Sequence, residues 1–244
     1  MTAGAARRRP GVAPSGAPSV PRSFYAGDPV EVGALLLNKL LVRGARVGRI
    51  VEVEAYRGAE DPASHAFGGQ TKRNAAMFGP PGHLYVYFTY GMHWCANVVC
   101  GPEGTGHAVL LRALSPVSGL GSMRRARPPG TSDRNLTSGP AKLCQAFGIT
   151  GDEDGADLVR GDRGLAVRDD GVPPPAAPGV SGRIGIRQAA DRPWRWWVEG
   201  DPHVSRGRPA PDAVAPGSRP GRDSGRGPRR RPEQGPERGP GPGA

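Results

Sequence analysis

The 244-residue chain has few cysteines and no long apolar run, and both shortages narrow its class. Its three cysteines, Cys95, Cys100 and Cys144, are odd in number and lack paired spacing, which indicates reduced thiols rather than a disulfide framework. No window of about 18 apolar residues exists, so we expect no membrane-spanning helix. No apolar stretch follows the N-terminal arginines, so no secretory signal is expected. These absences predict a cytoplasmic protein.

The common catalytic motifs are also missing. The histidines and cysteines show no CxxC or HxxxH spacing, so a bound metal is only a weak alternative, and no cofactor is expected. There is no GxSxG elbow for a nucleophilic serine, and GGQTKRN lacks the spacing of a phosphate-binding loop. The three lysines, Lys39, Lys72 and Lys142, lie outside the main strands predicted below. A lyase that forms a Schiff base would need one of them in its pocket, so lyase activity is not expected.

Glycine and proline are abundant, with 39 and 28 residues, and they concentrate at the two ends. Such segments bury too little apolar surface to offset chain entropy. We therefore predict disordered tails at residues 1–22 and 207–244 around one domain, residues 23–206. The net charge of +11 lies mostly in these tails, which carry +4 each against +3 for the domain. Arginine-rich tails favour polyanions, although solubility or coding bias explains them equally well.

The apolar spacing of the domain indicates mixed elements rather than alternating βαβ units. Asp28–Arg43 predicts a helix, with Asp28 as N-cap and Pro29 as its first residue, and residues 138–149 predict another. Strands are predicted for RVGRIVEVEAY, HLYVYFTYGMHWCANVVC (a hairpin turning at Gly91), HAVLLRALSP (ended by Pro116), GLAVRDD, SGRIGIRQA and RWWVEG, with GVPPPAAPGV as a loop. This order predicts an α+β fold: a single domain with a mainly antiparallel, curved β-sheet flanked by helices, and a protruding β-hairpin.

Two carboxylates on one face make the strand VEVEAY unusual. Read in steps of two, the apolar residues share one face, while Glu52, Glu54 and Tyr56 share the other. The simplest interpretation is an amphipathic strand with a solvated face. The polar loop that follows, residues 57–74, favours a functional interpretation, because long loops after strands often carry binding and catalytic residues.

The next predicted strand, LYVYFTY, places Tyr85 and Tyr87 on one face and Tyr90 at the turn. A tyrosine-rich strand is usually a half-buried sheet face, and a tyrosine beside a turn glycine usually packs back on its own hairpin. If they are instead exposed beside a glutamate and a histidine, these rings would form a stacking slot. Tyr90 would then act as a wedge pushed into a DNA stack. The residues alone leave both interpretations open.

Five blocks of the sequence resemble the alkyladenine (3-methyladenine) DNA glycosylase family. They are RIVEVEAYRGAEDPASHAF, GGQTKRNAAMFGPPGHLYVYFTYGMHWCANVV, AVLLRALSP, LTSGPAKLCQAFGI and RIGI, in that order and within residues 24–205. The resemblance implies a base-excision repair glycosylase that flips 3-methyladenine, similar alkylated purines or hypoxanthine out of double-stranded DNA. It implies hydrolysis of the N-glycosidic bond by a glutamate-activated water, which leaves an abasic site. It further implies a monofunctional monomer without lyase activity, metal or cofactor, associated with the nucleoid in a bacterium.

The resemblance also assigns catalytic roles to single positions. Glu54 matches the general base that activates water, and Arg112 matches an arginine that helps to hold this water. Ile184 matches a residue whose backbone carbonyl does the same.

The remaining matches concern binding. Tyr56, His65 and Tyr87 match residues that enclose the flipped base, and Asn97 matches the residue that discriminates against the exocyclic amino group of guanine. Tyr90 matches the side chain that fills the gap left in the duplex. The segment HAFGGQTKRN, residues 65–74, lacks a basic residue just before Gln70. Lys72 and Arg73 are therefore the candidates for contacts to the DNA backbone.

Two other functions compete with repair. A non-catalytic nucleic-acid-binding module would explain the basic tails and the aromatic strand, but a binder of polyanions gains nothing from a buried acid beside an aromatic slot. A small-molecule hydrolase using Glu54 would show no salt-dependent affinity for DNA.

Overall fold

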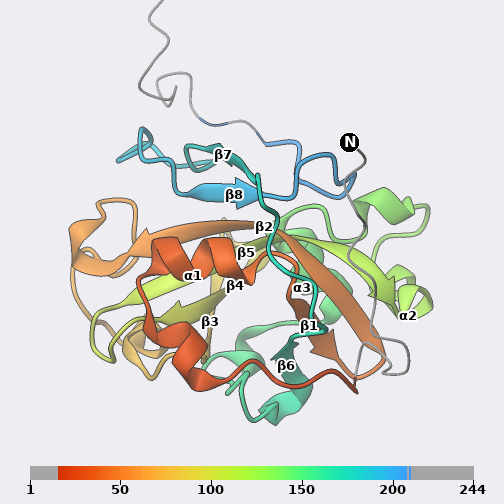
Figure 1. Cartoon of the computed structure of the whole chain (residues 1–244), viewed down its shortest axis with the longest axis horizontal. Coiled ribbons are helices and arrows are strands. Elements are labelled where there is room, and N and C mark those ends of the chain that lie inside the picture. The colour runs from red at the N-terminus through yellow and green to blue at the C-terminus, as the bar shows by residue number, and fades with distance from the viewer. Residues whose placement is uncertain (1–15, 208, 210–244) are drawn as a thin grey trace, which may run out of the picture.

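The computed structural model describes residues 16–207 and 209 of the chain as a mixed α+β structure (Figure 1). Its strands are β1 (Leu40–Arg43), β2 (Arg46–Arg57), β3 (Leu84–Thr89), β4 (His93–Cys100), β5 (His107–Ser118), β6 (Leu165–Arg168), β7 (Gly179–Ser181) and β8 (Arg195–Trp197). Its α-helices are α1 (Pro29–Leu36), α2 (Leu120–Arg125) and α3 (Pro140–Phe147). Short 3-10 turns lie at Arg22–Ala26, Gly58–Glu60, Ala75–Phe78, Asp133–Asn135, Gly151–Glu153 and Asp162–Gly164.

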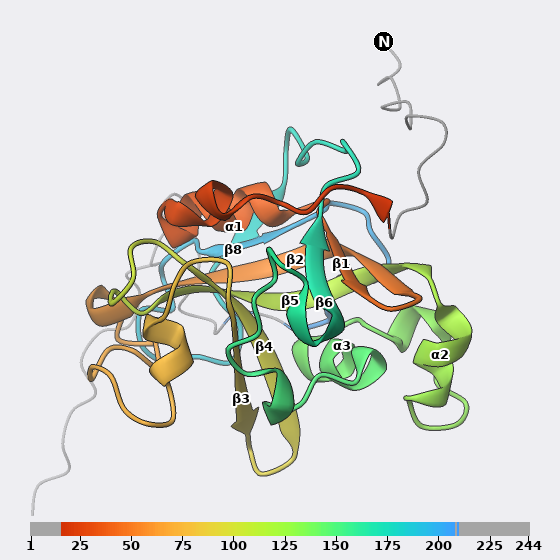
Figure 2. The same cartoon turned by 90° about the horizontal axis from the view of Figure 1, so that it is seen from below.

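The strands form one eight-stranded sheet in the order β3-β4-β5-β2-β1-β6, and every pairing among the described residues is antiparallel. β5 pairs along almost the whole of β2, so β1 and β8 must share the other edge of β2, with β7 outside β8. The hairpin of β3 and β4 projects from the body at the lower edge of Figure 2. The prediction of an α+β fold with a mainly antiparallel sheet and a protruding hairpin is confirmed.

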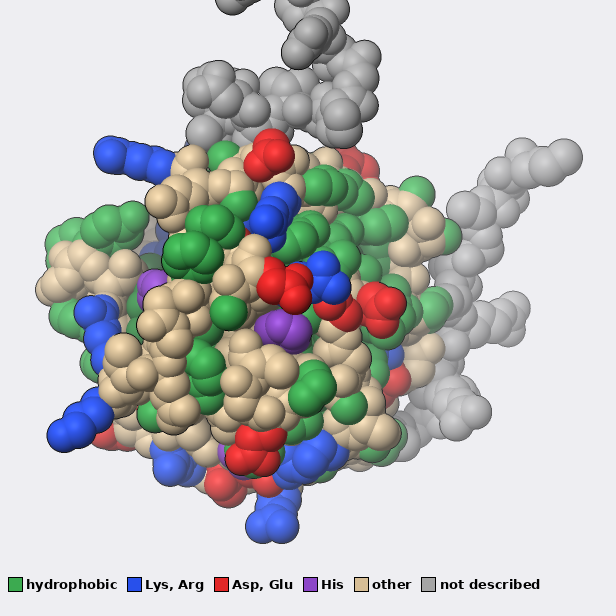
Figure 3. All heavy atoms as spheres, turned by 90° about the vertical axis from the view of Figure 1, so that its left-hand side faces the viewer, with side chains coloured by type: hydrophobic (Ala, Val, Ile, Leu, Met, Phe, Trp, Pro, Cys, Tyr) green, Lys and Arg blue, Asp and Glu red, His purple; other side chains and the backbone are tan. Residues whose placement is uncertain are grey.

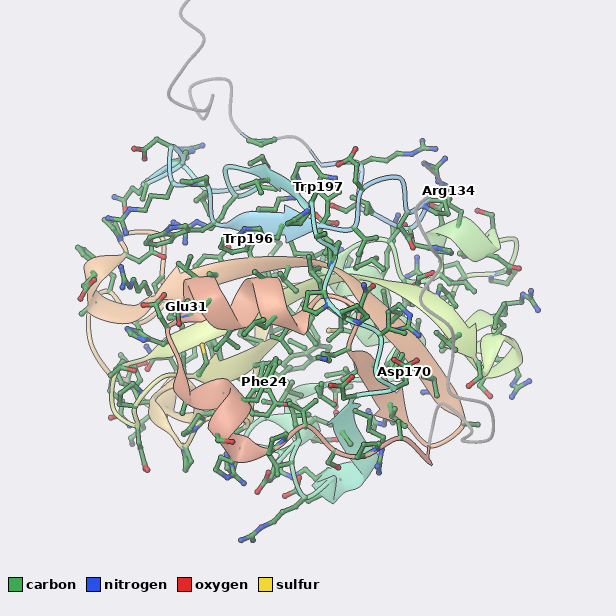
Figure 4. The ribbon with its side chains drawn as sticks, viewed as in Figure 1. Phe24, Glu31, Arg134, Asp170, Trp196 and Trp197 are labelled. Carbon is green, nitrogen blue, oxygen red and sulfur yellow. The ribbon has the colours of Figure 1, made fainter. Side chains whose placement is uncertain are left out.

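The long strand β2 positions the site because both of its faces are buried. Val53 and Ala55 belong to the main core, together with Val32 and Leu36 of α1. Figure 2 shows α1 and α3 on opposite sides of β2 and β5. Trp196 of β8 fits beside α1 because residue 33 is glycine: a Cβ there would lie 3.3 Å from the indole ring (Figure 4).

The opposite face of β2 does not face solvent. Glu52 and Glu54 are both 0% exposed, which excludes the amphipathic strand with a solvated face. The pairing of β2 with β5 shifts register on either side of Glu52. Such bulges re-aim side chains and are common next to active sites.

The helix predicted for Asp28–Arg43 is shorter than expected. Asp28 caps it as predicted, since its Oδ1 accepts a hydrogen bond from the backbone N–H of Val30 at 2.9 Å, but α1 ends at Leu36. Asn38 then adopts a left-handed φ of 69°, and residues 40–43 form β1. Apolar spacing in LLLNKLLV suits either element, and pairing of β1 with both β2 and β6 decides for the strand.

Two predicted strands also differ. β5 continues two residues past Pro116, which lies opposite Gly48 at a register shift, where a missing N–H is tolerated. SGRIGIRQA was expected as a strand, but only Ser181 belongs to β7. The following residues form a loop because the side chain of Arg183 turns into the core and bonds to Asp61. The predicted loop at 171–180 is correct except that Gly179 and Val180 begin β7.

Residues 16–22 fall in the predicted N-terminal tail, yet the structure packs them on the body. Ala17 and Val20 are buried, and the N–H of Val20 donates to the carbonyl of Val167 at 3.0 Å. Arg22 bonds to Asp157 at 2.5 Å. The ordered part therefore begins before residue 23. The rest of the predicted tails, residues 1–15 and nearly all of 208–244, lies outside the described residues.

Candidate active site

The carboxylate of Glu54 is held by three donors from three parts of the fold. Its Oε1 accepts the backbone N–H of Ile184 at 2.7 Å and lies 3.1 Å from Nη1 of Arg112 on β5. Its Oε2 accepts the hydroxyl of Tyr56 at 2.9 Å. Burial and the neighbouring Glu54 raise the pKa of Tyr56 well above its ordinary value, so this hydroxyl keeps its proton and donates it. These contacts fix the orientation of the Glu54 carboxylate.

A cavity of about 330 Å³ opens in front of this carboxylate. Tyr56, Arg112 and Ile184 line it, so the partners of Glu54 form the wall and Glu54 lies directly behind them. The cavity is within the roughly 300–1,000 Å³ typical of small-molecule sites. It therefore has room for one flat molecule beside the carboxylate.

Aromatic rings form the other walls. Tyr85 and Tyr87 of β3 stack at 5.6 Å between ring centroids with an interplanar angle of 27°, and the ring of His65 meets Tyr87 edge-on at 4.4 Å. The hydroxyl of Tyr85 lies 3.0 Å from Nδ1 of His65. The structure thus brings the predicted residues Tyr56, His65 and Tyr87 around one cavity and adds Tyr85, which the sequence left undecided.

His65 is neutral near pH 7. Burial lowers its pKa below the ordinary value, and the positive charge of Arg73 lowers it further. A neutral imidazole has one nitrogen that donates and one that accepts a hydrogen bond. His65 can therefore offer a polar contact without placing a positive charge in the cavity.

Asn97 lies on β4, deep in the same cavity. It is only 4% exposed and pairs in the sheet with Tyr85 and Leu110. Its Nδ2 donates to the backbone carbonyl of Tyr85 at 3.2 Å, its one side-chain hydrogen bond in the described part of the chain. The sheet therefore holds this amide in a fixed position in the cavity wall. There it can select among molecules by steric contact or by hydrogen bonding.

Arg112 is a buried cation between two carboxylates. Its Nε donates to Glu52 at 2.9 Å while Nη1 faces Glu54. Burial alone would lower the pKa of Arg112, but Glu54 and Glu52 raise it above the ordinary value. Arg112 is therefore charged at the site. Ile184 also contacts Glu54, through its N–H. The roles of Arg112 and of the Ile184 carbonyl in holding water stay predictions.

Sequence reasoning missed a buried ion pair behind Tyr56. Arg183 donates to both carboxylate oxygens of Asp61, and both side chains are 0% exposed. The guanidinium also donates to the carbonyl of Ala55 at 3.0 Å and lies 4.7 Å from the ring centroid of Tyr56. The pair ties the loop of Ile184 to the end of β2. An arginine inside the apolar block RIGI was the available signal.

Tyr90 does not pack back on its hairpin, because its side chain is 80% exposed. Tyr90 and Gly91 both have positive φ, 52° and 64°, and the N–H of Met92 donates to the carbonyl of Thr89 at 3.1 Å. This is the geometry of a type I′ turn, which normally takes Asn or Gly at both centres. Left-handed backbone costs a non-glycine residue roughly 1–2 kcal/mol. Backbone strain of this kind is concentrated at functional sites, so its presence at a residue with an exposed ring indicates a function for that ring.

Lys72 and Arg73 lie on the exposed loop beside the cavity. Nη2 of Arg73 donates to the carbonyl of Phe88 at 2.9 Å, which ties this loop to the end of β3. On the face shown in Figure 3, basic and acidic side chains are interspersed, so this face is not a continuous basic surface. The role of Lys72 and Arg73 in DNA contacts stays a prediction.

A metal site, a serine nucleophile or a Schiff-base lysine would each need particular groups among the described residues. No group of three or more His, Cys, Asp or Glu side chains in this part of the chain could hold a metal ion. A catalytic triad needs the serine and the aspartate on different nitrogens of the histidine ring. The side chains of Ser115 and Asp201 both lie 3.2 Å from the same nitrogen, Nδ1 of His203, so these three residues do not form a triad. None of the three lysines lines the cavity.

No helix between residues 16 and 207 combines the length and apolarity that crossing a membrane requires.

Known proteins resemble this chain over most of its length. A family model described as methylpurine-DNA glycosylase matches residues 23–202. A protein of Burkholderia cenocepacia named "Putative 3-methyladenine DNA glycosylase" is 57% identical over 204 residues, 83% of this chain and 99% of the relative. Proteins of the same name from Methanoculleus marisnigri and Agrobacterium fabrum are 51% and 50% identical over 77% and 78% of this chain, and 99% and 93% of the relatives.

Proposed function

The chain belongs to the methylpurine-DNA glycosylase family, and on this premise we propose that it excises 3-methyladenine and similar alkylated purines from duplex DNA. It is a DNA glycosylase of base-excision repair, a hydrolase of N-glycosyl bonds. The observation that best supports the proposed mechanism is the buried Glu54 carboxylate directly behind a cavity walled by aromatic rings.

Excision begins with flipping, because the glycosidic bond cannot be reached inside the base stack. Extrusion of a nucleotide costs a few kcal/mol. Stacking on aromatic side chains recovers about 1–3 kcal/mol per base, and Tyr56, His65 and Tyr87 would provide the rings. A purine alkylated at N3 is cationic, so it is attracted to electron-rich tyrosine faces and leaves readily.

Hydrolysis then needs a base and a stabilised sugar cation. The ionised Glu54 would take a proton from the attacking water and would stabilise the positive charge that develops on the sugar. Arg112 and the loop of Ile184 would help to place this water, since both contact the Glu54 carboxylate. Asn97 would discriminate against normal guanine at the exocyclic amino group of that base, because the sheet and the bond to Tyr85 hold its amide in a fixed position in the cavity wall.

The proposed function is tested by abasic-site formation. The purified full-length chain is incubated with alkylated duplex DNA, the product is cleaved with alkali, and the strands are separated on a gel. Strand breaks that need both protein and alkali are expected, because hydrolysis without lyase activity leaves an intact abasic site. DNA binding without such sites would favour the non-catalytic module. The absence of salt-dependent DNA affinity would favour a small-molecule hydrolase. A duplex containing hypoxanthine tests whether neutral purines are also substrates.

Replacement of Tyr90 should weaken lesion binding without disturbing the fold. We expect Tyr90→Asn to lower the affinity for a duplex with one alkylated purine by a few kcal/mol at most, since the ring would no longer fill the gap left by the flipped base. Asparagine suits the left-handed turn better than tyrosine does, so the temperature of thermal unfolding should not fall. Tyr90→Phe keeps the ring and should bind almost normally. Lesion binding by Tyr90→Asn as tight as that of the unchanged protein would contradict the wedge.

Further aspects of the proposal concern the setting of the enzyme. We propose that it works as a monomer, since one chain contributes every group around the cavity. We also propose that it acts in the cytoplasm, in contact with the nucleoid, because its substrate is duplex DNA. Size-exclusion chromatography with light scattering tests the monomer, and the mass of a dimer would contradict it.

A further inference from the structure

The second carboxylate of β2, Glu52, has no part in the mechanism above, yet it is the more heavily bonded of the two. Its Oε1 accepts Nε of Arg112 at 2.9 Å, Nε of Arg195 at 2.7 Å and the hydroxyl of Ser205 at 2.9 Å. Its Oε2 accepts the backbone N–H of Ser205 at 2.7 Å. Glu52 therefore joins β2, β5, β8 and the C-terminal segment at one fully buried point.

Glu52 is ionised at this point. Burial alone would raise its pKa, but Arg112, Arg195 and the N–H of Ser205 together lower the pKa below the ordinary value. A buried ion cluster of this kind is weak support for stability, because well-packed apolar side chains can often replace it at no cost. The arrangement therefore calls for a reason other than stability.

The geometry of Arg112 supplies one reason. Each nitrogen of its guanidinium has a separate partner: Nε has Glu52, Nη1 has Glu54 at 3.1 Å, and Nη2 has the hydroxyl of Ser205 at 3.5 Å. A guanidinium without these restraints tends to pair with a carboxylate through two parallel hydrogen bonds. Because Glu52 and Ser205 occupy two of its three corners, Arg112 presents only one corner to Glu54. This leaves Glu54 with acceptor capacity for a water molecule.

The C-terminal strap, defined here as residues 204–207, supplies a second reason. Ser205 is bound to Glu52 through both its N–H and its hydroxyl. Two residues later Gly207 lies against Ile184, so closely that a Cβ on Gly207 would fall 2.8 Å from its Cγ2. Glu52 thus anchors the segment that covers Ile184, and the N–H of Ile184 holds Glu54.

We propose that Glu52 is a positioning residue for base excision. It restrains Arg112 from one side and, through the C-terminal strap, Ile184 from the other, so that the Glu54 carboxylate keeps a vacant acceptor site toward the cavity. This inference rests on the proposed function, since it assigns Glu52 a role in the same reaction.

Glu52→Gln tests the proposal with little change of shape. Misplacement of reacting groups by about 1 Å costs about 100-fold in rate, so we expect the single-turnover excision rate to fall about 100-fold. The affinity for abasic-site DNA is measured beside the rate, because a merely structural role of Glu52 would lower both.

Glu153→Gln is the matched control. Glu153 is also a buried, paired carboxylate: it accepts Nη2 of Arg43 at 2.6 Å and the N–H of Thr150 at 2.7 Å. These partners do not line the cavity, whereas Arg112, the partner of Glu52, does. The pKa of Glu153 is likewise lowered, because Thr150 and Arg43 outweigh the effect of burial. Glu153→Gln should keep the excision rate of the unchanged protein. Both variants should bind abasic-site DNA within about threefold of it.

The outcomes separate the possible failures. An excision rate of Glu52→Gln equal to that of Glu153→Gln would overturn the positioning role, and so would an equal loss of excision and of abasic-site binding. If Glu52→Gln does not fold, Glu52→Asp retains the charge and shortens the side chain; it should lose rate while it still binds abasic-site DNA, and an unchanged rate would overturn the proposal. Failure of the unchanged protein to release alkylated purines would instead refute the proposed function.

Discussion

Glu54→Gln is expected to abolish purine release while leaving the affinity for abasic-site DNA nearly unchanged. Glutamine keeps the shape: its amide oxygen can still accept the N–H of Ile184, and its NH2 can donate to the hydroxyl oxygen of Tyr56, but it cannot take a proton from water. General-base catalysis contributes about 10²–10⁴-fold, and loss of the carboxylate charge removes further stabilisation of the sugar cation. The measurement is the single-turnover rate on a duplex with one alkylated purine, beside a gel-shift titration with abasic-site DNA.

The two readouts separate catalysis from folding. Equal loss of excision and of abasic-site binding would refute the general-base role, because it would mean that the variant no longer forms the site. Retention of a substantial excision rate would also refute this role. Glu153→Gln again serves as the control, since it removes a buried carboxylate charge whose partners, Arg43 and Thr150, do not line the cavity.

Arg183→Met is expected to cost the fold about 3–5 kcal/mol, because it leaves the Asp61 carboxylate buried without its cation. Burial alone would raise the pKa of Asp61, but the hydrogen bonds and charge of Arg183 lower it below the ordinary value. A carboxyl pKa that is lower in the folded than in the unfolded protein stabilises the fold at pH values above the ordinary aspartate pKa of about 3.9. This stabilisation is lost as the pH falls through the folded-state pKa. The unchanged protein should lose this contribution in acid, whereas Arg183→Met should lack it already at pH 7. Urea unfolding monitored by circular dichroism measures both.

A second substitution distinguishes an orphaned charge from lost packing. Arg183→Met combined with Asp61→Leu removes both charges and should recover much of the stability. Arg124→Met is the surface control: its pair with Asp133 is about half exposed on both sides, so unfolding should barely change. Stability of Arg183→Met equal to that of Arg124→Met would contradict the importance of the buried pair.

The fold was predictable where local forces decide it. The alternation in VEVEAY places the core residues and the two carboxylates on opposite faces of β2, and Asp28 with Pro29 starts α1 as the capping rules require. The end of α1 was not predictable in this way. Its apolar spacing continues into residues 40–43, and these residues become a strand because they pair with β2 and with β6, which lies more than 120 residues later in the chain.

The residues of the candidate site fall into the same two groups, those that the sequence could predict and those that it could not. The resemblance selected Glu54, Tyr56, His65, Tyr87 and Asn97, and the structure brings all five to one cavity or directly behind it. Their roles stay predictions until the variants are measured. The partners of the buried carboxylates were invisible, because Arg183 lies 122 residues from Asp61 and Ser205 lies 153 residues from Glu52.

The sequence by itself determined which side chains share a strand face and which ring stands at the hairpin tip, because a two-residue period and a turn are properties of neighbouring residues. Tertiary structure alone decided which charges meet. A buried carboxylate must find donors wherever the folded chain provides them, and for Glu52 these come from β5, β8 and the C-terminal strap.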